Sequence, residues 1–251
     1  MDYSAAGARA AVEEAGLRVL KSFLHYLFDA APRRVVADES YEQARSRYFP
    51  EGVTAPPPTG QRFGEVLDEW DANQAPFQFN FVHPGAMAYF TGPPLLSSVF
   101  GELLTQITNQ SVDVLKTGPT AAFVDEEVIG WLLAVTGIPK TGFGTLTSGG
   151  VMANLIGLMM AREAGGAPRS GVLRRKAALD RCRVYASDQA HFSVGRSLAV
   201  LGFPAEALRI VSTDDSLRLS GGPLREAVVD DLNSGLTPIA VVATRARPIV
   251  G

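Results

Sequence analysis

Apolar residues in the first part of the chain recur every three or four positions, which is the spacing of one face of an α-helix. The longest such stripe predicts a helix from about Ala6 to Phe28. Shorter helices are expected over residues 63–71, 96–107 and 124–135. Residues 53–61 contain three consecutive prolines, which fix φ and lack an N–H donor, so this segment is expected to be an irregular linker.

Beyond residue 142 the pattern changes to short β-rich runs that alternate with helical stretches. Strands are predicted at 183–186, 208–212 and 238–244, and helices at 151–163, 192–201 and 223–233. Such alternation is typical of an open α/β sheet, mostly parallel, with helices on both faces. A length of 251 residues fits one large domain of this kind preceded by a helical segment.

Composition and charge exclude several classes of partner and of cellular location. The chain has 23 basic and 26 acidic residues and a net charge of −3, with the basic residues scattered, so we expect neither nucleic acid nor a membrane as partner. Charged residues interrupt the apolar positions near the N-terminus, unlike the core of a signal peptide. The single cysteine, Cys182, can form no disulfide within the chain. A cytoplasmic location is therefore expected.

A candidate anion site precedes the helix predicted at 151–163. Ser148, Gly149 and Gly150 stand immediately before this helix, where free backbone N–H groups and the positive end of the helix dipole attract a phosphate. Alternatively, Ser148 caps the N-terminus of a buried helix and the glycines form a tight turn. The residues alone leave both interpretations open. The spacings of the dinucleotide fingerprint, the P-loop and the nucleophile elbow are not met.

Histidine side chains are the second kind of candidate. His191 follows the strand that is expected to end near Ala186, and ligands of open α/β sheets bind outside the carboxyl ends of the strands. We therefore expect His191 near the Ser148 loop, where its flat imidazole could stack on a ring; a capping or core-edge histidine is the alternative. His83 precedes Pro84 in a loop and is compatible with a site or with packing. No metal site is expected, because the three histidines and one cysteine lie far apart in the sequence.

Five short motifs, in this order along the chain, resemble those of one enzyme family. They occur between about Phe63 and Thr244, and the family is that of the group II pyridoxal-phosphate-dependent decarboxylases, which includes the aromatic amino acid, glutamate and diaminobutyrate decarboxylases. The motifs are His83-Pro-Gly-Ala-Met-Ala-Tyr-Phe90, Asn109-Gln-Ser-Val-Asp113, Thr147-Ser-Gly-Gly-Val-Met-Ala-Asn-Leu155, Ser187-Asp-Gln-Ala-His191 and Val241-Val-Ala-Thr244.

The resemblance implies the aspartate aminotransferase-like fold, known as fold type I, and the cofactor pyridoxal 5′-phosphate (PLP). His191 would stack on the pyridine ring, and Thr244 would stand beside the cofactor on the next strand. The domain division expected on this basis is a helical segment and linker at 1–80, part of the PLP-binding domain at 81–244, and a divergent tail at 245–251. The phosphate would be cradled by Ser148, Gly149, Gly150 and Val151.

The resemblance also implies a reaction and partners. An amino acid would lose its α-carboxylate as carbon dioxide through an external aldimine and a carbanion. His83, Pro84 and Tyr89 would wall the substrate pocket, and the full-length family forms homodimers.

Two departures from the family pattern concern the chemistry. Many members have Ser or Thr at the position of Val151. After Thr244 the family continues with an Asp for the pyridine nitrogen and a His-Lys pair for the Schiff base, whereas none of the four lysines here follows Thr244. We therefore assign no catalytic residue and expect this chain to be inactive by itself. A non-catalytic phosphate-ligand module and a helical dimerisation protein are the alternatives.

Overall fold

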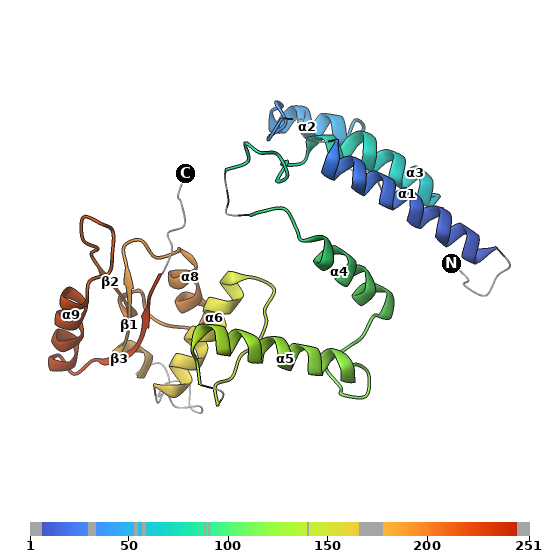
Figure 1. The fold of residues 1–251 in the computed structure, drawn as a ribbon. Helices are drawn as coiled ribbons and strands as arrows, with labels where there is room; N and C mark the ends of the chain where they lie inside the picture. The colour runs from blue at the N-terminus through green and yellow to red at the C-terminus, as the bar shows by residue number, and fades with distance from the viewer. Residues whose placement is uncertain are drawn as a thin grey trace. The chain divides into compact units, whose positions relative to one another are not determined.

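A computed structural model describes residues 7–29, 34–52, 55–56, 59–87, 89, 91–139, 141–165 and 178–244 (Figure 1). The chain divides into two compact units, Met1–Thr108 and Asn109–Gly251. The division expected at residue 80 concerns the extent of the cofactor-binding domain and stays a prediction. The tail at 245–251 lies outside the described residues.

The first unit is helical, and its main packing joins two helical segments. Tyr26 and Trp70 have ring centroids 6.5 Å apart, and the Ser22 hydroxyl donates to Asp71 over 3.0 Å. The elements are α1 (Ala8–Phe28), α2 (Tyr41–Tyr48), α3 (Phe63–Glu69), the π-helical turn η1 (Trp70–Gln74), the 3₁₀ turn η2 (Ala75–Phe77) and α4 (Leu96–Thr108).

The second unit is built on a three-stranded parallel sheet in the order β2-β1-β3. The carboxyl ends of the strands meet at one edge, because Ser187 pairs with Val211 and Ala186 with Val242. The elements are α5 (Pro119–Thr136), α6 (Gly150–Ala164), β1 (Cys182–Ser187), α8 (Ser193–Val200), the 3₁₀ turn η3 (Ala205–Ala207), β2 (Leu208–Val211), α9 (Gly221–Asn233) and β3 (Thr237–Val242).

Helices cover both faces of this sheet, α6 and α8 on one side and α9 on the other (Figure 1). Val184 and Ala186 of β1 pack in one apolar cluster with residues of α6 and α8. Tyr185 points the other way and packs with Ala227 of α9. Because helices cover both faces, Val184, Tyr185 and Ala186 are all fully buried, so this part of β1 shows no alternation of apolar and polar residues. The predicted parallel sheet with helices on both faces is confirmed.

A polar network that includes Tyr185 of the second apolar cluster joins β1, β2 and α9. The Tyr185 hydroxyl donates to Asp231 over 2.7 Å, and Arg209 forms an ion pair with the same carboxylate. Asp231 is 4% exposed and Tyr185 fully buried. Burial, followed by the hydrogen bond to Asp231, raises the pKa of Tyr185, so its phenol is a neutral donor at physiological pH.

The boundaries differ from the sequence predictions by a few residues at most. The helix expected from Ala6 begins at Ala8, and β3 ends at Val242, so Thr244 follows the strand instead of lying on it. The helix α2 was not predicted. No helix in the described part of the chain has both the length and the apolar character needed to cross a membrane.

Candidate functional site: a helix start and an imidazole at the sheet edge

Helix α6 begins with free backbone donors. Its N-cap is Gly149, which has no side chain, and the first helical hydrogen bond runs from Ala153 N–H to the Gly149 carbonyl over 3.0 Å. The N–H groups of Gly150, Val151 and Met152 therefore have no acceptor within the described residues. Ser148 does not cap this helix, so the capping alternative for its hydroxyl is wrong. Its side chain is exposed next to the free donors.

The two glycines of this turn leave open space in front of the helix. A Cβ atom placed on Gly149 or Gly150 would meet no heavy atom within 4 Å. Gly149 is extended, with φ 163° and ψ 169°, a conformation open to any residue. Neither packing within the described chain nor a left-handed backbone therefore requires glycine here. Room for a phosphate close to the backbone is a physical reason for both.

His191 is held close to the helix start by hydrogen bonds to Ser193. The Ser193 hydroxyl lies 2.7 Å from Nδ1 of the half-buried imidazole, and the Ser193 N–H donates to the same nitrogen over 3.2 Å. The Asn154 amide, one turn into α6, donates to the Ser193 hydroxyl over 2.8 Å. The helix that begins at the glycine turn and the imidazole are thus joined through two side chains, as expected for a common site at this edge.

One face of the imidazole lies against an aromatic ring. The rings of His191 and Phe192 have centroids 4.1 Å apart and planes inclined by 35°. The guanidinium of Arg196 lies 4.5 Å from the centroid of the Phe192 ring. This packing restricts the orientation of His191 without using its ring nitrogens.

Thr244 is found at the same sheet edge, in a hollow of its own. It follows β3 and lines a hollow of about 530 Å³ together with Ser187, Gln189 and Arg218, among others. The Asp214 carboxylate accepts from the Arg218 and Ser216 N–H groups, each over 2.9 Å, and fixes the loop at its border. The hydrogen bonds that join α6 to His191 do not include Thr244.

The three expected substrate residues belong to the first unit. The Nδ1 atom of His83 accepts from the Gly85 N–H over 2.9 Å. Tyr89 is 76% exposed, has a left-handed φ of 68° and packs edge-on against Phe79 with centroids 5.5 Å apart. Pro84 is exposed. These contacts explain the loop's shape, and the role in substrate binding stays a prediction.

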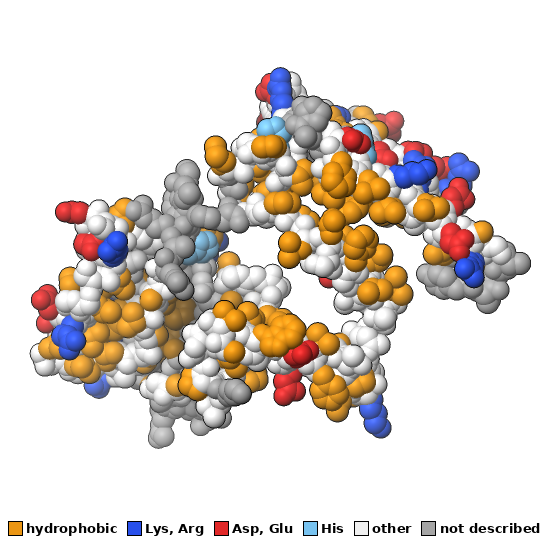
Figure 2. All heavy atoms as spheres, in the orientation of Figure 1, with side chains coloured by type: hydrophobic (Ala, Val, Ile, Leu, Met, Phe, Trp, Pro, Cys, Tyr) orange, Lys and Arg blue, Asp and Glu red, His pale blue; other side chains and the backbone are white. Residues whose placement is uncertain are grey.

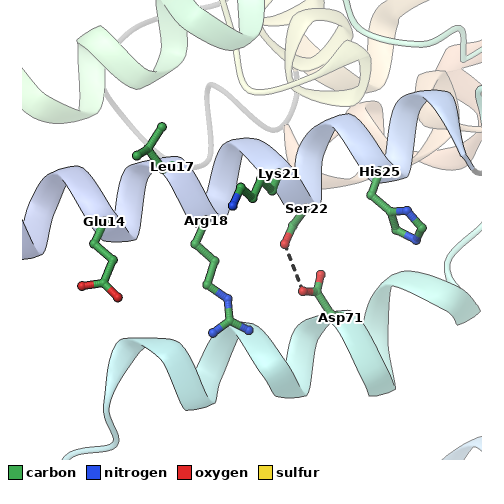
Figure 3. Close-up of a pocket in the computed structure, with 7 residues that line it drawn as sticks. All are labelled: Glu14, Leu17, Arg18, Lys21, Ser22, His25 and Asp71. Carbon is green, nitrogen blue, oxygen red and sulfur yellow. Dashed lines mark hydrogen bonds between the residues drawn. The ribbon is translucent and has the colours of Figure 1, made fainter.

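A groove in the first unit is explained by contacts between helices. It runs along α1 beside η1, has a volume of about 610 Å³, and is lined mainly by charged and polar side chains (Figure 3). Arg18 pairs with Asp68, and Ser22 donates to Asp71. These groups hold α1 against α3 and η1, which is a structural role. The described residues contain no group of three or more metal-ligating side chains.

Several solved structures share the fold of this chain. The structure superposes on the glutamate decarboxylase domain of a diaminobutyrate-pyruvate transaminase and L-2,4-diaminobutyrate decarboxylase from Vibrio parahaemolyticus with a TM-score of 0.80 at 21% identity, covering 96% of this chain and 51% of that one. For the structure of Oryza sativa TDC with PLP and tryptamine, the TM-score is 0.77 at 22% identity, covering 96% of this chain and 51% of that one. These superpositions show the aspartate aminotransferase-like fold, fold type I, that the sequence predicted.

Sequence comparison identifies the family. The pyridoxal-dependent decarboxylase conserved domain matches residues 54–248, and the chain belongs to this family. L-2,4-diaminobutyrate decarboxylase of Rhizobium meliloti (strain 1021) is 34% identical over 169 residues, which are 67% of this chain and 32% of that protein. Aromatic-L-amino-acid decarboxylase of Bacillus atrophaeus is 33% identical over 161 residues, which are 64% of this chain and 32% of that protein. The chain thus spans about a third of the length of these relatives.

Proposed function

We propose that this chain carries the cofactor-binding part of a PLP-dependent amino acid decarboxylase. The observation that carries the proposal is the junction of the open glycine turn before α6 with the imidazole of His191 through Asn154 and Ser193. Membership of a pyridoxal-dependent family supports the choice of ligand.

The phosphate of the cofactor fits the start of α6. The N–H groups of Gly150, Val151 and Met152 would donate to its oxygens, and the exposed Ser148 hydroxyl would add a further donor. The helix dipole favours the negative charge at this end. Each of these hydrogen bonds is made to a charged group and contributes about 1.5–3 kcal/mol net.

The pyridine ring of the cofactor would stack on the face of the His191 imidazole opposite Phe192. Thr244, at the same sheet edge, would stand beside the cofactor. When bound, the cofactor supplies an electron sink for the electron pair left on the substrate α-carbon as carbon dioxide departs. The residues of this chain would bind the phosphate, orient the ring and exclude water from one of its faces.

A binding experiment tests this assignment. PLP and pyridoxal, which lacks the phosphate, are titrated separately into the 251-residue chain and followed by cofactor absorbance. We expect PLP to bind at least about tenfold more tightly, because only PLP reaches the donors of α6. His191→Ala should weaken the binding of both ligands, since both contain the pyridine ring. Equal affinity for the two ligands would refute the phosphate site.

We further propose that the 251-residue chain alone holds the cofactor without a covalent bond and does not catalyse decarboxylation. In the described residues Lys21 lies on α1 of the first unit and Lys116 precedes α5, and neither belongs to the site described above. The other two lysines, Lys140 and Lys176, lie outside the described residues. Borohydride reduction followed by mass spectrometry should find no lysine adduct, and a trapped adduct would contradict this proposal.

The substrate is proposed to be an amino acid, with His83, Pro84 and Tyr89 walling its pocket. The family to which the chain belongs supports this choice. Tyr89→Ala should weaken binding of the amino acid in the full-length enzyme and leave PLP binding unchanged. A change in PLP affinity alone would contradict this role.

A homodimer is proposed for the full-length protein, in the cytoplasm. Helices α4 and α5 have no buried residues, and their apolar side chains form exposed surfaces (Figure 2). Ile107 is 70% and Trp131 59% exposed. Exposed apolar surface of this kind is typical of interfaces. Sedimentation of the full-length protein as a monomer would refute the dimer.

The absence of any cysteine other than Cys182 supports a reducing compartment.

A further inference from the structure

We infer that Ser193 and Asn154 are positioning residues that fix the tautomer and orientation of the His191 imidazole. This inference rests on the proposed function, because it gives the hydrogen-bond chain a role in cofactor binding. It concerns two side chains that neither contact the free donors of α6 nor belong to the predicted site.

The direction of each hydrogen bond follows from the groups involved. The Asn154 Nδ2 atom can only donate, so the Ser193 oxygen accepts its hydrogen. The Ser193 hydroxyl then has its own hydrogen available for Nδ1 of His191, 2.7 Å away. The backbone N–H of Ser193 also points at Nδ1, and a backbone N–H is always a donor. Two donors therefore converge on one ring nitrogen.

A nitrogen that accepts two hydrogen bonds carries no proton. The neutral His191 ring therefore has its hydrogen on Nε2, on the far side of the ring from Ser193. Ser193 is completely buried and Asn154 half-buried, so water competes little for these bonds. Hydrogen bonds shielded from water are stronger and more directional than exposed ones.

The same hydrogen bonds connect the two parts of the site, which are the start of α6 and the His191 imidazole. Asn154 lies one turn after the free donors of α6, and Ser193 is the first residue of α8. A shift of α8 against α6 would therefore move the imidazole relative to the phosphate turn. Phe192 restrains the ring from one face, so Ser193 and Asn154 set its rotation while Phe192 sets its tilt.

Nitrogen NMR of the free protein tests the tautomer directly. Long-range ¹H–¹⁵N spectra of the 251-residue chain with ¹⁵N-labelled histidine distinguish the two neutral tautomers at about pH 8, where an ordinary imidazole is neutral. We expect His191 to be almost entirely Nε2–H, with His25 and His83 as reference signals from the first unit.

Two variants change the hydrogen bonds from Asn154 through Ser193 to His191 in different ways. Ser193→Ala removes the hydroxyl donor. Asn154→Asp is nearly isosteric but turns a donor into an acceptor, so the Ser193 hydrogen is drawn toward residue 154 and the Ser193 oxygen is free to accept from Nδ1. Both variants should increase the Nδ1–H fraction of His191, and PLP affinity should fall about three- to tenfold, the effect of one net hydrogen bond.

Ser197→Ala is the matched control. Ser197 lies on the same helix, is 2% exposed, and its hydroxyl has no hydrogen-bond partner among the described residues. Its removal should change neither the His191 tautomer nor PLP affinity. A purely structural effect of losing a buried hydroxyl from α8 would instead appear in this variant too.

The outcomes separate this inference from the proposed function. An unchanged His191 tautomer in both Ser193→Ala and Asn154→Asp overturns the positioning role, whether or not PLP binds. A tautomer shift with unchanged PLP affinity also overturns it, because the ring orientation would then not matter for binding. A wild-type chain that binds no PLP refutes the proposed function, and the positioning role toward PLP with it, while the spectra still report whether the hydrogen-bond chain exists.

Discussion

Gly149→Asp should change PLP affinity strongly while leaving the stability of the fold nearly unchanged. The backbone at Gly149 is extended and a Cβ there meets nothing within 4 Å, so an aspartate fits without strain. Aspartate is moreover a favourable N-cap, and its charge interacts well with the helix dipole. The free energy of unfolding of the variant should therefore stay the same or rise by up to about 1 kcal/mol.

The same carboxylate should oppose PLP binding. It would lie next to the N–H groups of α6 and compete for them, and it would repel the phosphate, which carries about −1.5 to −2 charges. Two unit charges about 4 Å apart interact by roughly 1 kcal/mol in water and 4 kcal/mol near a protein surface. Multiplied by the charge of the phosphate, the value in water is about 1.5–2 kcal/mol, which corresponds to a loss of about ten- to thirtyfold in affinity.

The assay is a parallel titration of PLP and pyridoxal into the wild type, Gly149→Asp and a matched control, Gly222→Asp. Gly222 lies in the first turn of α9, and a Cβ there also meets nothing within 4 Å. Only Gly149→Asp should lose PLP affinity, and added salt should reduce the loss. Pyridoxal affinity should not change. PLP binding within twofold of the wild type, in a folded Gly149→Asp variant, would refute the phosphate site.

Three further predictions concern single side chains. Val151→Ser adds a hydroxyl beside the free N–H groups of α6 and should tighten PLP binding about tenfold, the low end for a hydrogen bond to a charged group; absence of any gain in the titration would place the phosphate elsewhere. Tyr185→Phe removes a donor from the buried Asp231 carboxylate and should lower the free energy of unfolding in urea by about 1.5–3 kcal/mol, and an unchanged midpoint would contradict the network. The backbone N–H of Arg218, followed by that of Ser216, lowers the pKa of Asp214 below its ordinary value of 3.8. The ionised carboxylate therefore stabilises the loop fully above pH 3.8. This stabilisation is lost as the pH falls through the lower pKa of the folded state. Amide exchange of the loop, corrected for intrinsic rates, should lose protection only in that acid range, and Asp214→Ala should lose it already at pH 7; equal protection in the two proteins would count against the assignment.

Periodicity predicted those helices of this chain that have an apolar stripe, and it failed where a helix has none. Helix α2 reads Tyr-Glu-Gln-Ala-Arg-Ser-Arg-Tyr, which lacks an apolar face, so the pattern gave no signal. The local signal was instead its capping box, in which the Ser40 side chain accepts from the Gln43 N–H and the Gln43 side chain from the Ser40 N–H. Such a box satisfies free donors whatever the helix packs against, and it is readable from the sequence.

The sequence by itself determined the alternation of strands and helices, the glycine turn before α6 and the family, because these depend on residues close together in the chain or on motifs in a fixed order. Only the tertiary structure decided that Gly149 and not Ser148 caps α6, and that Asn154 meets Ser193, 39 residues away. The tertiary structure alone likewise decided the strand order β2-β1-β3 and the hydrogen bond between Tyr185 and Asp231, which are 46 residues apart. The physical reason is that these contacts arise from packing helices on the two faces of one sheet, and the sequence pattern of a segment specifies which face it buries without specifying its partner.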